Sequence, residues 1–239
     1  TSTWLYRRLL RSIIPAYRAV GIYHSCYSMV ECHEGGCHER NTAYKHIYID
    51  LHIIIYILHT LQEKMKVTLI RHTSVAVEKG VCYGQTDVPV AATFPEEAER
   101  TKTNLNGKVF DKVYSSPLTR ARQLAEYCGY TDYTVDDRLL EMNMGDWEMK
   151  RYDDIKDDNL QKWYDDYMHV ATTNGESFPM IYKRVADFLD ELKTKDYKHV
   201  AVFAHCGILL CAGIYGGLFS EEGCFEHTVD YGGIEEIEI

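Results

Sequence analysis

The stretch Lys66-Val-Thr-Leu-Ile-Arg71 is a short, mostly apolar run, and His72 follows it directly. A run of this kind is typical of a strand that is covered on both faces of a sheet. A second such run, Val200-Ala-Val-Phe-Ala204, is followed directly by His205. The two runs indicate an α/β protein in which both histidines stand at strand ends.

Strand and helix patterns alternate through the rest of residues 66–239. Further strands are expected at 112–115, at 134–135 and, as an edge strand, within 232–239. Helices are expected at 95–106, 158–168, 181–192 and 208–215. One more helix is expected after the second strand, with Ser116 as its cap and Pro117 as its first residue. Strands separated by helices predict a three-layer α/β/α sandwich with a largely parallel sheet. Ligands of such folds bind at the carboxyl ends of the strands.

The chain divides into two unlike parts near Met65. Residues 1–64 carry slightly more basic than acidic side chains, whereas the formal net charge of the whole chain is −10. We therefore expect 65–239 to be the working domain. Residues 1–64 are expected to be an N-terminal extension, either poorly ordered or upstream of the native protein. The acidic balance argues against nucleic acid or an anionic membrane as a partner, although a local arginine cluster could still bind a small anion.

The first part holds two features that could suggest a function. Cys26, Cys32, Cys37, His33 and His38 lie close together, but paired CxxC motifs are absent, so we expect no metal. The apolar stretch 47–61 is shorter than the roughly 20 residues that span a bilayer, and it contains polar residues. With no secretory leader pattern and no disulfide framework, a cytoplasmic location is expected. The sequence leaves a homo-oligomer open.

Charged or titratable side chains follow each of the predicted parallel strands. Arg71 and His72 end the first, Arg120 lies in the first turn of the helix after the second, Glu141 follows the third, and His205 ends the fourth. Singly, each could be an ordinary loop or surface residue. Together they form a cationic cluster in an acidic protein, which favours a phosphate ester as the ligand. No Asp-rich or Gly-rich phosphate motif accompanies them, so no cofactor is expected.

Four motifs in order resemble the histidine phosphatase (phosphoglycerate mutase-like) superfamily. They are Arg71-His72-Thr73, Ser115-Ser-Pro-Leu-Thr-Arg-Ala-Arg-Gln123, Leu140-Glu141 through Gly145-Asp-Trp-Glu148, and Ala204-His205-Cys-Gly207. The resemblance implies a phosphoglycerate mutase-like fold and phosphoryl transfer through a phosphohistidine on His72. It implies that Arg71, Arg120 and His205 hold the phosphoryl oxygens. Glu141 would protonate the leaving oxygen and later deprotonate the hydrolytic water.

The loop Val81-Cys-Tyr-Gly-Gln-Thr-Asp-Val-Pro89 narrows the resemblance. With RHT, GDWE and Gly175-Glu-Ser177, it is similar to the α-ribazole phosphatases of cobalamin biosynthesis. That branch implies removal of the 5′-phosphate from α-ribazole phosphate or from adenosylcobalamin 5′-phosphate. It implies that Gly84 and Gln85 border the phosphate, with Glu176 and Ser177 near the pocket. Tyr83, Trp147 and Tyr152 are either ordinary packing residues or a wall for the benzimidazole base.

Two other function classes remain open. One is a histidine phosphatase or phosphoglycerate mutase-like enzyme that acts on a different small phosphate ester. The other is a non-catalytic protein that binds a phosphorylated ligand on the same fold. The second is disfavoured because binding alone does not need Glu141 as a proton donor.

Overall fold

A computed structural model of the protein describes residues 64–239. The predictions made for residues 1–63, including the Cys/His group and the apolar stretch 47–61, lie outside the described residues. The boundary at Met65 therefore stays a prediction.

The described part contains a five-stranded sheet with the order β3-β2-β4-β1-β5. The strands are β1 (Lys66–Arg71), β2 (Lys112–Ser115), β3 (Thr134–Val135), β4 (His199–Ala204) and β5 (Ile234–Glu238). The first four are parallel, and β5 pairs antiparallel with β1 at the edge of the sheet. In the register of β1 with β4, Arg71 is the partner of Ala204, so that His72 and His205 leave the sheet side by side.

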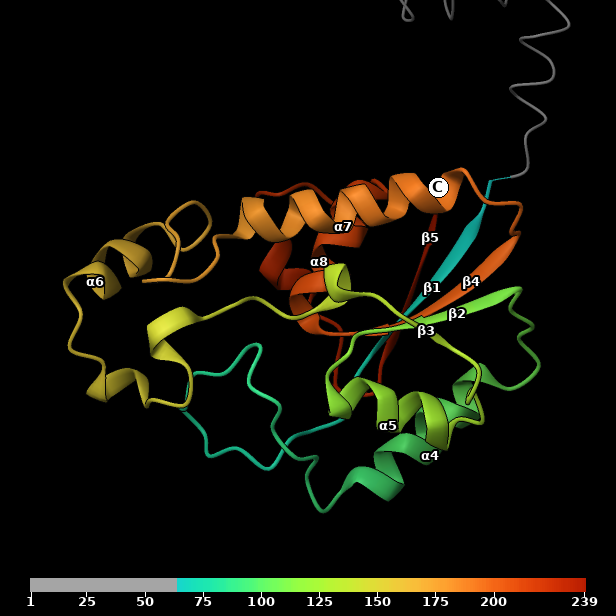
Figure 1. Ribbon diagram of the computed structural model, residues 1–239, viewed down its shortest axis with the longest axis horizontal. Helices are drawn as coiled ribbons and strands as arrows, with labels where there is room; N and C mark the ends of the chain where they lie inside the picture. Colours follow the sequence, from blue (N-terminus) through green and yellow to red (C-terminus); the bar gives the residue numbers. More distant parts are fainter. Residues whose placement is uncertain (1–63) are drawn as a thin grey trace, which may run out of the picture. The chain divides into compact units, whose positions relative to one another are not determined.

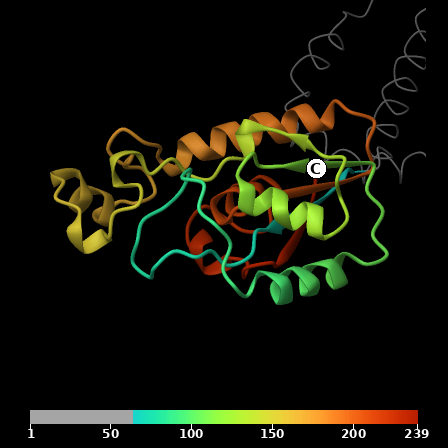
Figure 2. The same ribbon diagram turned by 60° about the horizontal axis from the view of Figure 1, so that its bottom comes forward.

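Helices cover both faces of this sheet, which confirms the three-layer prediction (Figure 1). They are α4 (Phe94–Leu105), α5 (Thr119–Tyr127), α6 (Asp158–Asp165), α7 (Phe178–Lys193) and α8 (Cys206–Tyr215). The short 3₁₀ helices are η1 (Asp137–Leu139), η2 (Gly145–Trp147), η3 (Tyr152–Asp154) and η4 (Cys224–His227). The view in Figure 2 places α7 on one side of the sheet and α4 and α5 on the other.

Alternate side chains of each central strand enter two different cores. Val67 and Leu69 of β1 pack with α7 and α8, whereas Ile70 packs with α4 and α5. Because both faces are covered in this way, the strands read in the sequence as continuous apolar runs. The two cores fix the carboxyl ends of β1, β2 and β4 at one edge, where the charged residues follow.

The segment 136–177 extends beyond the sheet and has a small core of its own (Figure 1). Cys82, Met144, Trp147 and Ile155 form this core, and Tyr152 packs against it. Trp147 is fully buried, and its indole N–H donates to Asp157 at 2.7 Å. The loop around Tyr83 is held against this segment, which also carries Glu141, because the backbone of Cys82 is hydrogen-bonded to Met149 and Lys150.

Two predicted helix ends differ from the structure. The helix after β2 begins at Thr119 with Leu118 as its N-cap, so the prediction of Ser116 as the cap and Pro117 as the first helical residue is wrong. The physical reason is that the Ser116 hydroxyl, three residues before the helix, is bound to His205. The helix predicted at 158–168 ends at Asp165, and Asp166 instead binds His169.

Candidate active site

The five predicted catalytic residues all lie at the carboxyl edge of the sheet: Arg71 is the last residue of β1, and the other four lie in a loop, a helix cap or a first helical turn after a strand. Three of them are almost completely enclosed, with exposed fractions of 3% for His72 and 0% for Arg120 and His205. The rings of His72 and His205 are 5.1 Å apart between centroids. The structure thus brings together groups that are up to 134 positions apart in the chain.

His72 is held as a neutral ring with one defined proton. Its Nδ1 is 2.7 Å from the carbonyl oxygen of Thr73. A carbonyl can only accept, so Nδ1 carries the proton and Nε2 keeps its lone pair. Burial, followed by the positive charge of Arg120, lowers the pKa of His72 to about 3, against the opposing effect of the Thr73 carbonyl. The ring is therefore an unprotonated nucleophile at neutral pH.

His205 is oriented by Ser116. Its Nε2 is 2.7 Å from the Ser116 hydroxyl, which also accepts the Leu118 N–H at 3.3 Å. Burial, and then the charges of His72 and Arg120, lower the pKa of His205 well below its usual value. The other ring nitrogen of His205, Nδ1, is buried and has no hydrogen-bond partner.

Each of the two arginines also has an unpartnered donor, at Nε. Arg120 donates from one terminal nitrogen to the Thr86 carbonyl at 3.0 Å and from the other to the Gly84 carbonyl at 2.6 Å. Arg71 donates to the carbonyl of Val229. The Nε atoms of both arginines are buried without a partner. Buried donors are normally satisfied, and leaving one unpaired costs about 1–3 kcal/mol or more for a charged group.

Two tyrosines face these arginines. The Arg71 guanidinium lies 4.2 Å from the ring centroid of Tyr231, and that of Arg120 lies 5.6 Å from the ring centroid of Tyr83. The two hydroxyl groups are 3.1 Å apart and hydrogen-bonded. The Tyr231 ring is also 5.6 Å from that of His72. The tyrosine pair therefore borders the cationic cluster.

Glu141 reaches the same site from the loop after β3. Its carboxylate accepts the Met142 N–H at 3.0 Å and the Gly207 N–H, at the start of α8, at 3.3 Å. Its backbone carbonyl accepts from the Gln85 side chain at 3.0 Å and from Arg184 at 3.1 Å. These contacts fix the carboxyl group near the N-terminus of α8, next to His205.

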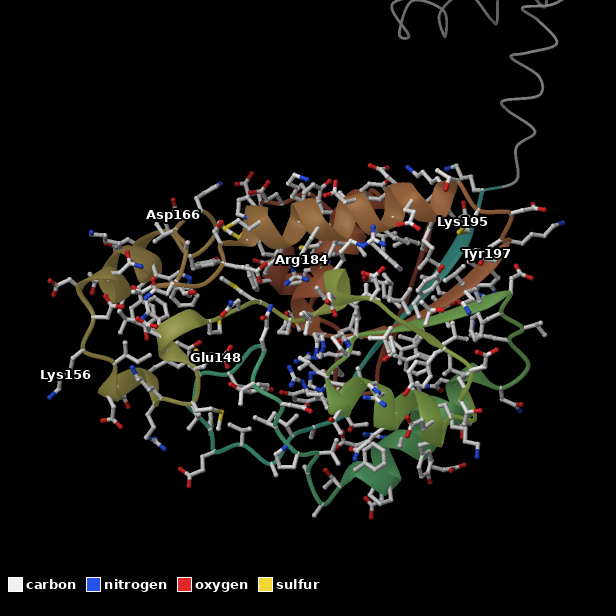
Figure 3. The ribbon with its side chains drawn as sticks, viewed as in Figure 1. Glu148, Lys156, Asp166, Arg184, Lys195 and Tyr197 are labelled. Carbon is white, nitrogen blue, oxygen red and sulfur yellow. The ribbon has the colours of Figure 1, made fainter. Side chains whose placement is uncertain are left out.

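The four predicted substrate-binding residues differ in how they contact the rest of the site. Gly84 lends its carbonyl to Arg120, and the Gln85 side chain holds the backbone of Glu141. Glu176 forms an ion pair with Arg184, at 3.0 Å, and accepts the Asn143 N–H at 2.8 Å. Ser177 is the N-cap residue of α7 and is 7% exposed. Gly84 and Gln85 thus adjoin the predicted catalytic residues, whereas Glu176 is connected to them through Arg184, which also donates to the Glu141 carbonyl. Arg184 is labelled in Figure 3.

The structure adds residues that the sequence reasoning missed. The Thr73 carbonyl orients His72, Ser116 orients His205, Tyr231 covers Arg71, and Arg184 donates to the carbonyls of Arg138 and Leu140 as well as to that of Glu141. Ser116 lies inside one of the quoted motifs, so its position next to Arg120 was a usable signal. A backbone carbonyl and a single arginine on a long helix give no comparable signal.

Two features of the described part bear on metals and membranes. Within residues 64–239, no group of three or more histidine, cysteine or acidic side chains is arranged to hold a metal ion. In the same range, no helix combines the length and the apolar character that crossing a bilayer requires. The cysteines described there, at 82, 128, 206, 211 and 224, are not paired.

Several known proteins are similar to this chain in sequence and in structure. Residues 67–238 match the model of the histidine phosphatase superfamily (branch 1). The adenosylcobalamin/α-ribazole phosphatase of Escherichia coli K12 is 31% identical over 185 residues, which cover 73% of this chain and 90% of that protein. The phosphoserine phosphatase 1 of Hydrogenobacter thermophilus is 25% identical over 146 residues, covering 58% and 69%. The crystal structure of the α-ribazole phosphatase from Shigella flexneri aligns with a TM-score of 0.67 at 30% identity, covering 73% of this chain and 91% of that one.

Proposed function

The chain belongs to the histidine phosphatase superfamily (branch 1), and from this membership we propose that it removes the 5′-phosphate of α-ribazole phosphate, or of adenosylcobalamin 5′-phosphate, through a phosphohistidine on His72. The protein is a phosphatase that acts on a small phosphate ester. The proposal concerns the identity of that ester and the part played by each residue of the site.

One observation carries the assignment of the site. Two buried guanidinium donors with no partner, the Nε–H groups of Arg71 and Arg120, and the unpartnered Nδ1 of His205 lie around a neutral histidine. A phosphoryl group has three equatorial oxygens that can accept such donors, and charge builds on them as the bond to the leaving group breaks. The donors are already in place before the ester arrives, so little reorganisation is needed in the reaction.

The first step forms a bond from His72 Nε2 to phosphorus and breaks the bond from phosphorus to the ester oxygen. The Glu141 carboxyl gives its proton to that oxygen, which leaves as an alcohol. In the second step Glu141 removes a proton from water, the water oxygen bonds to phosphorus, and the bond to Nε2 breaks. Phosphate leaves, and His72 and Glu141 return to their starting forms.

The proposed substrate is supported by relatives and by one part of the site. The E. coli and Shigella flexneri proteins are named as α-ribazole phosphatases, and this chain covers about nine tenths of each. Of the three aromatic residues considered as a wall for the base, Trp147 and Tyr152 belong to the small core of the segment 136–177. Tyr83 faces Arg120 and, with Tyr231, is the aromatic surface that we propose contacts the leaving group.

A second candidate is a phosphatase of the same superfamily that acts on another ester. The observations in its favour are two relatives from Hydrogenobacter thermophilus: a protein named putative phosphoserine phosphatase 2, which is 31% identical over 182 residues, as similar as the E. coli protein, and phosphoserine phosphatase 1, at 25% identity. Mutase activity and non-catalytic binding are the further alternatives that turnover measurements separate. A cytoplasmic location and a homo-oligomeric state stay predictions.

Steady-state kinetics on a small panel of esters tests the proposal. The panel is α-ribazole 5′-phosphate, phosphoserine, 3-phosphoglycerate and an aryl phosphate, measured after exhaustive chelation with EDTA. We expect kcat/KM for α-ribazole 5′-phosphate to exceed that for 3-phosphoglycerate by at least about 10²-fold, because the apolar leaving group gains from contacts with buried side chains. No isomerisation of phosphoglycerate is expected.

Each result of the panel has a distinct meaning. Equal kcat/KM values for α-ribazole 5′-phosphate and for phosphoserine would reject the proposed substrate but not the phosphatase activity. Activity that is lost with EDTA and restored by Mg²⁺ or Zn²⁺ would reject the role of the arginines and His205 as the sole partners of the phosphoryl charge. No turnover of any ester would favour a binding protein.

A further inference from the structure

Glu148 is a carboxylate surrounded only by hydrogen-bond donors. Its Oε2 accepts the N–H of Gly84 at 3.0 Å and the N–H and hydroxyl of Thr86 at 3.3 and 2.7 Å. Its Oε1 accepts the N–H of Gln85 at 2.8 Å and that of Met144 at 3.2 Å. Three consecutive backbone amides therefore converge on one side chain, which Figure 3 labels.

The same three-residue loop faces Arg120 with its carbonyl groups. Gly84 and Thr86 accept the two terminal nitrogens of the Arg120 guanidinium, at 2.6 and 3.0 Å. These two carbonyls occupy both ends of the guanidinium fork. Each terminal nitrogen keeps a second N–H, and the fifth donor of Arg120, Nε–H, is buried without a partner.

One peptide group lies directly between the two charges. The carbonyl of Gly84 and the N–H of Gln85 belong to the same peptide bond, and they bind Arg120 and Glu148 respectively. The negative carboxylate pulls on the N–H end, while the positive guanidinium pulls on the oxygen end. Such a chain of hydrogen bonds polarises each of its members and strengthens both contacts.

The backbone at position 84 can take this place only as glycine. A Cβ on Gly84 would lie 1.8 Å from the carbonyl oxygen of Met142 and 3.0 Å from the Glu148 carboxylate. The loop therefore packs directly against the segment that joins Glu141 to Glu148. The position of this loop relative to Arg120 and Glu141 is set by this backbone contact and by the Glu148 carboxylate.

We propose that Glu148 is a positioning residue for Arg120, which acts through the peptide between Gly84 and Gln85 and aims the free Nε at the phosphoryl group. The inference rests on the proposed function in one respect, that the site binds a phosphoryl group. It does not depend on which ester is the substrate. No contact of Glu148 with the ligand is required.

The charge state of Glu148 agrees with this role. Burial by itself raises the pKa of the carboxyl group, but the hydrogen bonds from Gly84, Thr86, Gln85 and Met144 outweigh it, and the net pKa lies below the ordinary value. Glu148 is therefore ionised whenever the enzyme works near neutral pH. An ionised acceptor makes hydrogen bonds about twice as strong as a neutral one does.

The substitution Glu148→Gln isolates the effect. Glutamine has the same shape, but its amide group brings two donors into a position where all five neighbouring groups donate. At least one of the loop amides then loses its acceptor, and the Gly84 and Thr86 carbonyls shift relative to Arg120. Asp146→Asn is the matched control, because Asp146 lies in the same motif but is exposed and binds only the side chain of Asn174.

The readout is the affinity for inorganic phosphate, measured by calorimetry, which needs neither turnover nor the natural substrate. We expect Glu148→Gln to weaken phosphate binding and kcat/KM on an aryl phosphate by up to about 10²-fold, the usual cost of a misplaced catalytic group. Asp146→Asn is expected to stay within about twofold of the unmodified protein in both measurements.

A double-mutant cycle with Arg120→Lys separates positioning from general support of the fold. Lysine keeps the charge but cannot hold both carbonyls, so Glu148 should no longer matter to phosphate binding. We expect Glu148→Gln to add less than about twofold in that background. An undiminished loss there, or phosphate affinity unchanged in Glu148→Gln itself, would overturn the inference. A protein that binds phosphate with these couplings but hydrolyses no α-ribazole phosphate would reject the proposed substrate alone.

Discussion

The Glu141 carboxylate fills the space that Gly207 leaves beside the N-terminus of α8. The N–H of Gly207 donates to Glu141 Oε2 at 3.3 Å, and a Cβ on Gly207 would lie 2.6 Å from Oε1. The backbone donor and the missing side chain act together. They place the proposed general acid beside the N-terminus of α8.

The first prediction follows from this contact. Alanine is a better helix former than glycine by about 1 kcal/mol, so Gly207→Ala should leave the unfolding free energy equal or higher. Its methyl group must nevertheless displace the Glu141 carboxylate, and we expect kcat to fall by at least about tenfold. Steady-state kinetics and chemical denaturation measure the two effects. A variant with the original kcat would show that Glu141 is not confined by this contact.

The second prediction concerns the leaving group. Glu141→Gln should lower the rate of the phosphorylation step by about 10²–10⁴-fold for an alkyl phosphate, whose oxygen must be protonated as it leaves. The loss should shrink for an activated aryl phosphate, whose oxygen needs little protonation. Rapid-quench measurement of the phosphoenzyme compares the two. Equal losses for both leaving groups would argue against a proton donor.

The third prediction concerns stability and pH. The pKa of His72 is lowered by burial, and next by Arg120, to about 3. In the unfolded chain the histidine has its ordinary pKa of about 6.5. Between pH 6.5 and the folded-state pKa of about 3, the unfolded chain therefore binds a proton at His72 that the folded chain does not bind. The free energy of unfolding should fall as the pH decreases through this window, by up to about 1.4 kcal/mol per pH unit for this one group.

Denaturant unfolding of the original protein and of His72→Asn between pH 6 and pH 4 measures this slope. As the pH falls, the unfolding free energy of the variant should decrease less per pH unit than that of the original protein, by the contribution of about one proton. His205 contributes in the same direction in both proteins, because its pKa is also lowered by burial. Identical slopes would mean that His72 titrates as an exposed histidine does.

The fourth prediction separates the ring of Tyr231 from its hydroxyl. The ring lies over the Arg71 guanidinium, and a desolvated contact of this kind is worth up to about 2 kcal/mol. Tyr231→Ala should therefore lower kcat/KM by about 5–30-fold. Tyr231→Phe, which removes only the bond to Tyr83, should change it by less than about threefold. If phenylalanine were as damaging as alanine, the hydroxyl pair would be the important element.

The sequence was sufficient to predict the sheet and to place the five candidate catalytic residues at one edge of it, for a physical reason. Strands covered on both faces must be apolar throughout, and the register of β1 with β4 then brings His72 and His205 together without further information. The partners of these residues were not predictable in the same way. The bonds of Ser116 to His205 and of Arg184 to the Glu141 backbone depend on side chains that meet only in the folded state.

The aromatic residues show where motif reading stops. Tyr83, Trp147 and Tyr152 lie in or near quoted motifs, yet Trp147 and Tyr152 pack inside the segment 136–177 while Tyr83 faces Arg120. The direction of a side chain in an irregular loop follows from the hydrogen bonds of that loop, such as those that Glu148 receives. No periodicity in the sequence predicts these hydrogen bonds.

The central claim is that phosphorus passes through His72. Brief exposure to ³²P-labelled aryl phosphate followed by acid- and base-quench should trap a label that is stable in base and labile in acid, and peptide mass spectrometry should place it on His72. Replacement by alanine should remove both the label and turnover. The account would be contradicted by normal turnover in His72→Ala, or by a label located on any other residue.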